Sequence, residues 1–134
     1  MLVFEAPIDL LSFIELFPKN WQQHNYLSLG GVSAKALQQF LSERPDVERV
    51  FLCLDSDKAG EDACKRLAAL LPDTVSVTRI QPCMKDWNDV LAHRAEIPNR
   101  NYFKSIVLKE PSKPETVKII RMSDVELTPV EWLW

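Results

Sequence analysis

Two aspartates at the end of an apolar segment are the residues best suited to chemistry in this sequence. Asp55 and Asp57 directly follow the apolar run 50–54, and a helix-forming segment begins after them. Acids this close raise one another's pKa unless a cation neutralises them. The pair either caps the following helix or binds a cation such as Mg²⁺ or Mn²⁺, which prefer carboxylate oxygens. Taken alone, the D-x-D pattern leaves both interpretations open.

A third acid and a glycine pair follow two other apolar segments. Glu5 comes directly after the apolar residues 2–4. Burying a carboxylate at such a position is costly, and this cost favours a metal-binding role for Glu5. Gly30 and Gly31 follow residues 26–29 and indicate either a tight turn or a close approach of the backbone to a phosphate. A metal at such a site could orient a phosphodiester, stabilise its developing charge or activate a nucleophile.

The segment KDWND brings a cation and further acids. Asp86 is interpreted mainly as the N-cap of the helix that follows it, and Trp87 as a packing residue. Lys58 and Lys85 are cations close in sequence to the acids and could assist them electrostatically. Solvated surface lysines are the more ordinary interpretation of both.

The elements that must position these residues alternate between short apolar strands and amphipathic helices. This order predicts an α/β fold with a central, mainly parallel, four-stranded sheet flanked by helices on both faces. Ligands bind such sheets beyond the carboxyl ends of the strands, where the acids and glycines stand. Strands are expected at residues 2–4, 26–29, 49–54 and 74–80, and helices at residues 8–17, 33–43 (capped by Ser33), 58–71 and 86–95.

Composition limits the class of protein. A chain of 134 residues with 46% hydrophobic and 26% charged residues is typical of one ordinary globular domain. A net charge of −3 argues against a nucleic-acid clamp that is cationic as a whole. The three cysteines lack zinc or disulfide spacing and indicate reduced thiols. The sequence has no apolar run of membrane-spanning length and no signal peptide, so we expect a cytoplasmic protein without a membrane partner.

With these elements in place, the sequence resembles the Toprim domain, which bacterial primases, topoisomerases and several nucleases share. LVFEAPIDLLS is similar to the first strand of the family with its glutamate, and YLSLGG to the second strand with its glycine. VFLCLDSDKAGEDA resembles the aspartate motif in its primase-like form, and MKDWNDVL the segment after the fourth strand. The four motifs occur in order over residues 1–95. The chain departs from the primase pattern at Ala6 and Pro7, where primases have glycine after the glutamate.

The resemblance implies roles for individual residues of a Toprim domain over residues 1–110. It implies Mg²⁺ (or Mn²⁺) as cofactor, held by three acids that are also catalytic, and a second group that binds phosphate or nucleotide. The first group is Glu5, Asp55 and Asp57, and the second is Gly30, Gly31, Lys58, Lys85 and Asp86.

The last part of the chain carries a second resemblance. Residues 111–134 are expected to be a linker followed by SDVELTPVEWLW, which resembles the lead-in to the RecA-like ATPase domain of primase–helicases. We therefore expect this chain to be a piece of a longer replication protein of a phage, plasmid or other mobile element. Its partners would be single-stranded DNA, nucleotides and a helicase domain in cis.

The expected function is Mg²⁺-dependent nucleotidyl transfer in DNA replication, in which a DNA primase makes RNA primers. Two alternatives stay open at the level of sequence. One is phosphodiester cleavage, of the nuclease or topoisomerase kind, by the same metal site. The other is a non-catalytic docking module. In either enzymatic case the isolated chain is expected to be inactive or nearly so, because the parts that grip a template are missing from it.

Overall fold

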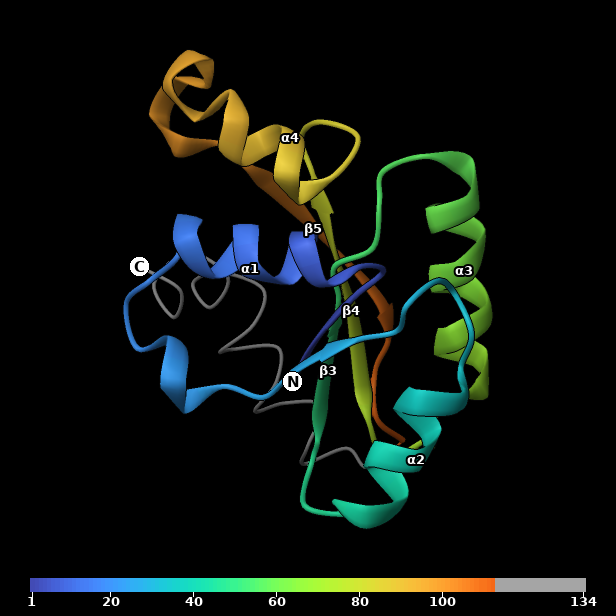
Figure 1. Cartoon of the computed structure of the whole chain (residues 1–134). Helices are drawn as coiled ribbons and strands as arrows, with labels where there is room; N and C mark the ends of the chain where they lie inside the picture. Colours follow the sequence, from blue (N-terminus) through green and yellow to red (C-terminus); the bar gives the residue numbers. More distant parts are fainter. Residues whose placement is uncertain (113–134) are drawn as a thin grey trace.

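A computed structural model describes residues 1–112 as a sheet with helices on both faces (Figure 1). The expected linker and ATPase lead-in at 111–134 lie almost wholly outside the described residues. The strands are β1 (Leu2–Phe4), β2 (Tyr26–Ser28), β3 (Arg49–Leu52), β4 (Ser76–Pro82) and β5 (Phe103–Lys109). The helices are α1 (Pro7–Leu16), α2 (Lys35–Glu43), α3 (Lys58–Leu70) and α4 (Trp87–Ala92), with short 3-10 turns η1 (Trp21–Gln23), η2 (Arg94–Glu96) and η3 (Pro98–Arg100).

The sheet has the strand order β2-β1-β3-β4-β5. Strands β1 to β4 pair in parallel, and β5 pairs antiparallel with β4. The expected α/β fold with a mainly parallel sheet is therefore confirmed. The fifth strand is additional to the four expected. Its sequence, FKSIVLK, mixes apolar and polar residues without a buried run, because β5 lies at the edge of the sheet and is largely exposed.

The two faces of the sheet are covered by different helix pairs. Helices α2 and α3 cover one face and α1 and α4 the other, as Figure 1 shows. Alternation along β3 explains the division, since Val50 and Leu52 point into the α2/α3 core and Phe51 and Cys53 into the α1/α4 core. Each core buries apolar area from strands and helices together, which is the main stabilising contribution to such a fold.

An aromatic cluster holds α4 in place. The Trp87 side chain is fully buried, and its ring lies edge-on to that of Phe13 at 4.8 Å between centroids. Its indole Nε1 donates a hydrogen bond of 2.9 Å to the carbonyl of Cys53, just beyond β3. The interpretation of Trp87 as a packing residue is thus confirmed. Because Trp87 is the first residue of α4, this contact brings the start of the helix against the end of β3.

The helix starts differ slightly from the expected ones. Helix α2 begins at Lys35 with Ala34 at the N-cap position, so the prediction of Ser33 as N-cap is wrong by one residue. The Ser33 hydroxyl still accepts a hydrogen bond of 3.3 Å from the backbone N–H of Lys35. Helix α1 begins at Pro7, whose fixed φ and missing N–H suit a first helical position. Among residues 1–112, no helix has the length and apolar character needed to cross a membrane.

Candidate metal centre

Glu5 and Asp55 lie together at the carboxyl edge of the sheet. Strands β1 and β3 are direct neighbours, with Leu2 opposite Phe51 and Val3 opposite Leu52. The chains leaving these strands therefore emerge side by side. The backbone N–H of Asp55 donates to Oε1 of Glu5 at 3.3 Å. The two acids thus come together as the order of apolar segments indicates.

The Asp55 carboxylate is poorly satisfied by the protein. Its Oδ1 is buried and accepts no hydrogen bond from the described residues. Burial, followed by the negative charges of Glu5 and Asp9, raises the pKa of Asp55 to about 7. A buried acceptor without a donor is costly. This carboxylate is stabilised by either a proton or a cation.

The charged form of the Glu5 carboxylate is also disfavoured, although less strongly than that of Asp55. Partial burial raises its pKa, and the charges of Asp57 and Asp9 act in the same direction. The hydrogen bond from the Asp55 backbone and the positive charge of Arg79 partly oppose these effects. The edge of the sheet therefore holds mutually repelling acids that a cation would relieve.

Asp9 is an acid of this cluster that the sequence reasoning did not select. It stands in the first turn of α1 and is only 5% exposed. Its Oδ1 accepts a hydrogen bond of 3.2 Å from the backbone N–H of Asn88 in α4. Burial is the main cause of its raised pKa, and the charge of Asp86 adds to it. Asp9 stands two residues after Pro7 on a helix that also carries Ser12 and the acid Glu15, so no local signal distinguishes this position.

Asp57 and Asp86 cap helices, which is one of the interpretations that the sequence suggests for each of them. Oδ1 of Asp57 accepts a hydrogen bond of 2.8 Å from the N–H of Gly60 and caps α3. Oδ1 of Asp86 accepts a bond of the same length from the N–H of Asp89 and caps α4. Each cap uses one carboxylate oxygen and leaves Oδ2 for another ligand. Capping and metal binding by Asp57 are therefore compatible.

A buried arginine fixes the loop that carries the aspartates. Arg79 of β4 is 3% exposed and donates from Nη2 to the carbonyl of Asp55 at 3.0 Å. Its Nη1 donates to the carbonyl of Gly60 at 3.1 Å and contacts Sγ of Cys64 at 2.7 Å. The guanidinium thus ties the end of β3 to the first turn of α3. No role was predicted for Arg79, although a cation within an apolar strand was a visible signal.

Gly60 allows this close approach. A Cβ added at Gly60 would lie 2.0 Å from the carbonyl oxygen of Asp55, well inside van der Waals contact. Only glycine lets α3 start this close to the end of β3. The quoted aspartate motif contains Gly60, but the reason for a glycine there becomes visible only in the fold.

The other predicted residues lie around the acids, and among the described residues their contact with these acids is to the backbone of Glu5 and not to a carboxylate. Gly30 and Gly31 have φ values of +64° and +137°, and the N–H of Gly31 donates to the carbonyl of Glu5 at 2.9 Å. A Cβ at either glycine would meet nothing within 4 Å, so the conformation and not a protein neighbour requires them. Lys58 pairs with Asp62 along α3 at 2.9 Å, and Lys85 is exposed. The roles of these glycines and lysines in binding phosphate stay predictions.

The donor set fits a hard, water-rich cation. Within residues 1–112, no three acidic, histidine or cysteine side chains form a ready-made metal site. Mg²⁺ commonly binds through one or two carboxylates and keeps several water ligands, so it does not require one. The unpartnered Oδ1 of Asp55, beside Glu5, suits such an ion. The surrounding donors are all oxygens, which also suits Mn²⁺.

We expect Asp55 to lower the stability of the metal-free chain as pH rises. Its pKa of about 7 in the fold exceeds the ordinary value of 3.8, so the folded state binds more protons than the unfolded state between these values. The stabilising effect of its proton is complete below pH 4 and is lost as pH rises through 7. Thermal unfolding in a chelator between pH 4 and pH 8 should show a shallower fall of Tm for Asp55→Asn. Parallel curves for the two proteins would contradict the shifted pKa.

Comparison with known proteins agrees with this geometry. The family model described as Toprim-like matches residues 2–91, which include Glu5 and both aspartates. The chain belongs to the Toprim-like family. All four parallel strands and helices α1 to α3 of this Toprim-like domain fall within the matched residues.

Two relatives refine the comparison. The domain is similar to the crystal structure of the primase fragment of the bacteriophage T7 primase-helicase protein, with a TM-score of 0.59 and 25% identity over 75% of this chain and 41% of that one. It is also 34% identical over 70 residues to the uncharacterized protein MG010 homolog of Mycoplasma pneumoniae, covering 50% of this chain and 33% of that protein. The chain therefore spans less than half the length of either relative. Together with the family match, the phage structure makes this a primase-like Toprim domain.

Proposed function

We propose that this Toprim-like domain is the catalytic domain of a DNA primase or primase–helicase and carries out Mg²⁺-dependent nucleotidyl transfer for RNA primer synthesis. The observation that carries the proposal is the buried, unpartnered Oδ1 of Asp55 beside Glu5 at the carboxyl edge of the sheet. The likeness to a phage primase fragment supports the choice of reaction.

The acids would have different roles because their surroundings differ. Asp55, Glu5 and the free oxygen of Asp57 would hold Mg²⁺ or Mn²⁺, which when bound would neutralise nucleotide phosphates and the charge that develops on them. Glu5 would serve either as a ligand of this ion or, when it does not bind the ion, as a group that holds or releases a proton at the edge of the site. The turn at Gly30 and Gly31 faces open space, where a phosphate could approach the backbone.

The parent protein would supply what the domain lacks. A net charge of −3 gives this chain little general affinity for a nucleic-acid backbone, so single-stranded DNA would be gripped by other parts of the parent. We propose a RecA-like helicase domain in cis as one of these parts, in a cytoplasmic replication protein of a mobile element. For the same reason the isolated chain should be inactive or nearly so.

The test is a comparison of two reactions in the longer parent protein. Wild type and Asp55→Asn are assayed for primer synthesis from ribonucleotides on single-stranded DNA, and for cleavage of a labelled strand. We expect the rate of primer synthesis to fall about 100-fold or more in the variant. Removing a metal ligand should lower activity at least as much as removing a group that only holds a ligand in place. Cleavage that depends on Asp55 would instead favour a nuclease. Retention of full activity in the variant would favour a non-catalytic module.

A further inference from the structure

A pocket of about 400 Å³ lies between the end of α1 and the turns that follow α4. The charged residues of its lining are three cations and one acid, namely Lys19, Arg94, Arg100 and Glu15. We propose that this pocket binds a phosphodiester of the single-stranded nucleic acid that reaches the candidate metal centre, an inference that rests on the proposed function. One such contact would add to the hold of the rest of the parent on the strand and would not replace it.

The three cations come from separate parts of the chain. Lys19 follows α1, Arg94 is the first residue of η2 and Arg100 the last of η3, and all three are exposed. Figure 1 shows the turns after α4, in gold and orange, above the end of α1 that is farther from α3. The fold therefore concentrates positive charge here, within a chain whose net charge is −3. Exposed cations of this kind attract the phosphates of a nucleic-acid backbone.

The backbone at Arg100 adopts a conformation that arginine rarely takes. Asn99 and Arg100 have φ values of +57° and +55°, both in the left-handed region. Asparagine tolerates this region, whereas the Cβ of arginine makes it unfavourable. The N–H of Tyr102 donates to the carbonyl of Arg100 at 2.8 Å and holds the turn. Strain of this kind is concentrated at functional positions, so the charged side chain at position 100 is a candidate ligand-binding group.

An apolar floor lies beneath the cations. Tyr102 is 8% exposed, and its ring lies edge-on to that of Phe17 at 5.9 Å between centroids. Leu16 and Pro18 complete the apolar part of the lining. An apolar surface lowers the local dielectric constant, so an ion pair formed beside it is stronger than one in bulk water.

Two negative features limit the charge of the anion. Glu15 is the acid of the lining, and Leu16, which also lines the pocket, is the last residue of α1. The carbonyl end of a helix carries a partial negative charge. A phosphodiester has one negative charge, so these groups repel it less than they repel inorganic phosphate or a nucleoside triphosphate, which have more. The lining therefore suits a backbone phosphate of a strand better than a free phosphate.

Helix α1 spans the interval between the pocket and the metal centre. It begins at Pro7, two residues after Glu5, and ends at Leu16 in the lining of the pocket. A helix of 10 residues is about 15 Å long. A stacked single strand rises by about 3.4 Å per nucleotide, so about four nucleotides cover this distance. A strand held at the pocket can therefore extend to the metal centre.

The first test removes one cation and keeps its turn. Binding of hexathymidylate and of inorganic phosphate to the isotope-labelled full chain is followed by NMR in a chelator at several salt concentrations. Arg100→Gly should weaken hexathymidylate binding about 2- to 5-fold, the effect of one exposed ion pair, and should make its salt dependence shallower. Glycine adopts a positive φ without cost, so the turn is kept. Asn99→Gly, which changes the adjacent residue but no charge, should bind as wild type does.

The second test should raise the affinity, which damage to the fold would not do. Glu15→Gln removes the acid of the lining, and we expect hexathymidylate to bind about 2- to 5-fold more tightly and inorganic phosphate to gain more than that. Lys19→Gln removes a cation of the pocket, and Lys35→Gln removes an exposed cation of α2 outside it. The first of these should weaken binding as Arg100→Gly does. The second changes the net charge equally and is the matched control.

The outcomes separate this inference from the proposed function. If Lys19→Gln and Arg100→Gly bind hexathymidylate as tightly as Lys35→Gln does, the pocket is refuted and the metal centre is unaffected. If inorganic phosphate binds wild type as tightly as hexathymidylate does, the ligand is an isolated phosphate, and the assignment to a strand is overturned. If the pocket variants weaken strand binding but Mn²⁺ does not bind the chain, the phosphodiester site stands and it is the proposed function that fails.

Discussion

Asp55→Asn/Asp57→Asn is expected to weaken Mn²⁺ and Mg²⁺ binding by about 100-fold or more, because loss of supporting groups alone costs 10- to 100-fold in metal affinity. The unpartnered Oδ1 of Asp55 and the remaining oxygen of Asp57 are carboxylate oxygens available to an ion there. Asparagine keeps the shape of each side chain, and its carbonyl can still cap α3 at position 57. Titration calorimetry with Mn²⁺ measures the loss.

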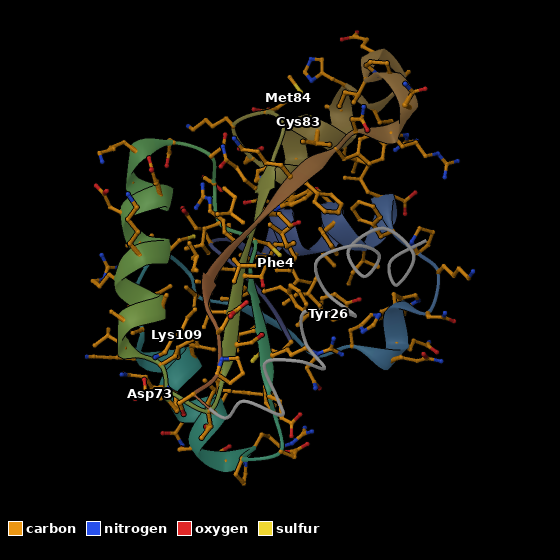
Figure 2. The ribbon with its side chains drawn as sticks, turned by 180° about the vertical axis from the view of Figure 1, so that it is seen from behind. Phe4, Tyr26, Asp73, Cys83, Met84 and Lys109 are labelled. Atoms are coloured by element: carbon orange, nitrogen blue, oxygen red, sulfur yellow. The ribbon has the colours of Figure 1, made fainter. Side chains whose placement is uncertain are left out.

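The same substitution should make the metal-free chain more stable. It removes two like charges beside Glu5, so Tm in a chelator at pH 8 is expected to rise while metal affinity falls. Asp73→Asn is the control, because Asp73 pairs with Lys109 at 3.1 Å at the opposite end of the sheet (Figure 2). Metal binding by the double variant that equals that of wild type would refute the metal centre and with it the proposed reaction.

Gly60→Ala is expected to lower the free energy of unfolding by about 3 kcal/mol, at the upper end for a group forced into a packed site. Its new Cβ would lie 2.0 Å from the carbonyl oxygen of Asp55, a backbone atom that cannot rotate away. Helix α3 must move outward, which also lengthens the bonds of Arg79 to Asp55 and Gly60. Metal affinity should fall as well, because the same movement displaces the aspartate loop.

A second variant separates the steric overlap at position 60 from the effect of helix propensity. Alanine is the better helix former by about 1 kcal/mol, so propensity alone predicts that Gly60→Ala stabilises α3. Ala69→Gly, on the exposed side of the same helix, measures that propensity effect without an overlap. Urea unfolding of both variants gives the two free-energy changes. Stability of Gly60→Ala equal to or above wild type would show that α3 does not start against the end of β3.

The sequence by itself determined the local features of the site. Alternating apolar segments predict the parallel strands, and an acid after each of two strands predicts that Glu5 and Asp55 share an edge. The cap at Asp57 depends on residues three positions apart, and the glycine turn needs only its own two residues. Such features can be predicted because the periodicity of strands and helices and the chemistry of caps are short-range.

Only the tertiary structure decided which other groups act on the acids. Asp9 joins the cluster through a bond to a residue 79 positions away, and Arg79 reaches Asp55 from 24 positions away. Strand β5 lacks a buried apolar run because an edge strand is covered only in part, yet it completes the sheet beside β4. These contacts are set by how helices pack on a twisted sheet. No short-range pattern carries that information, because the same residue types would be ordinary surface or core residues at any other place in the fold.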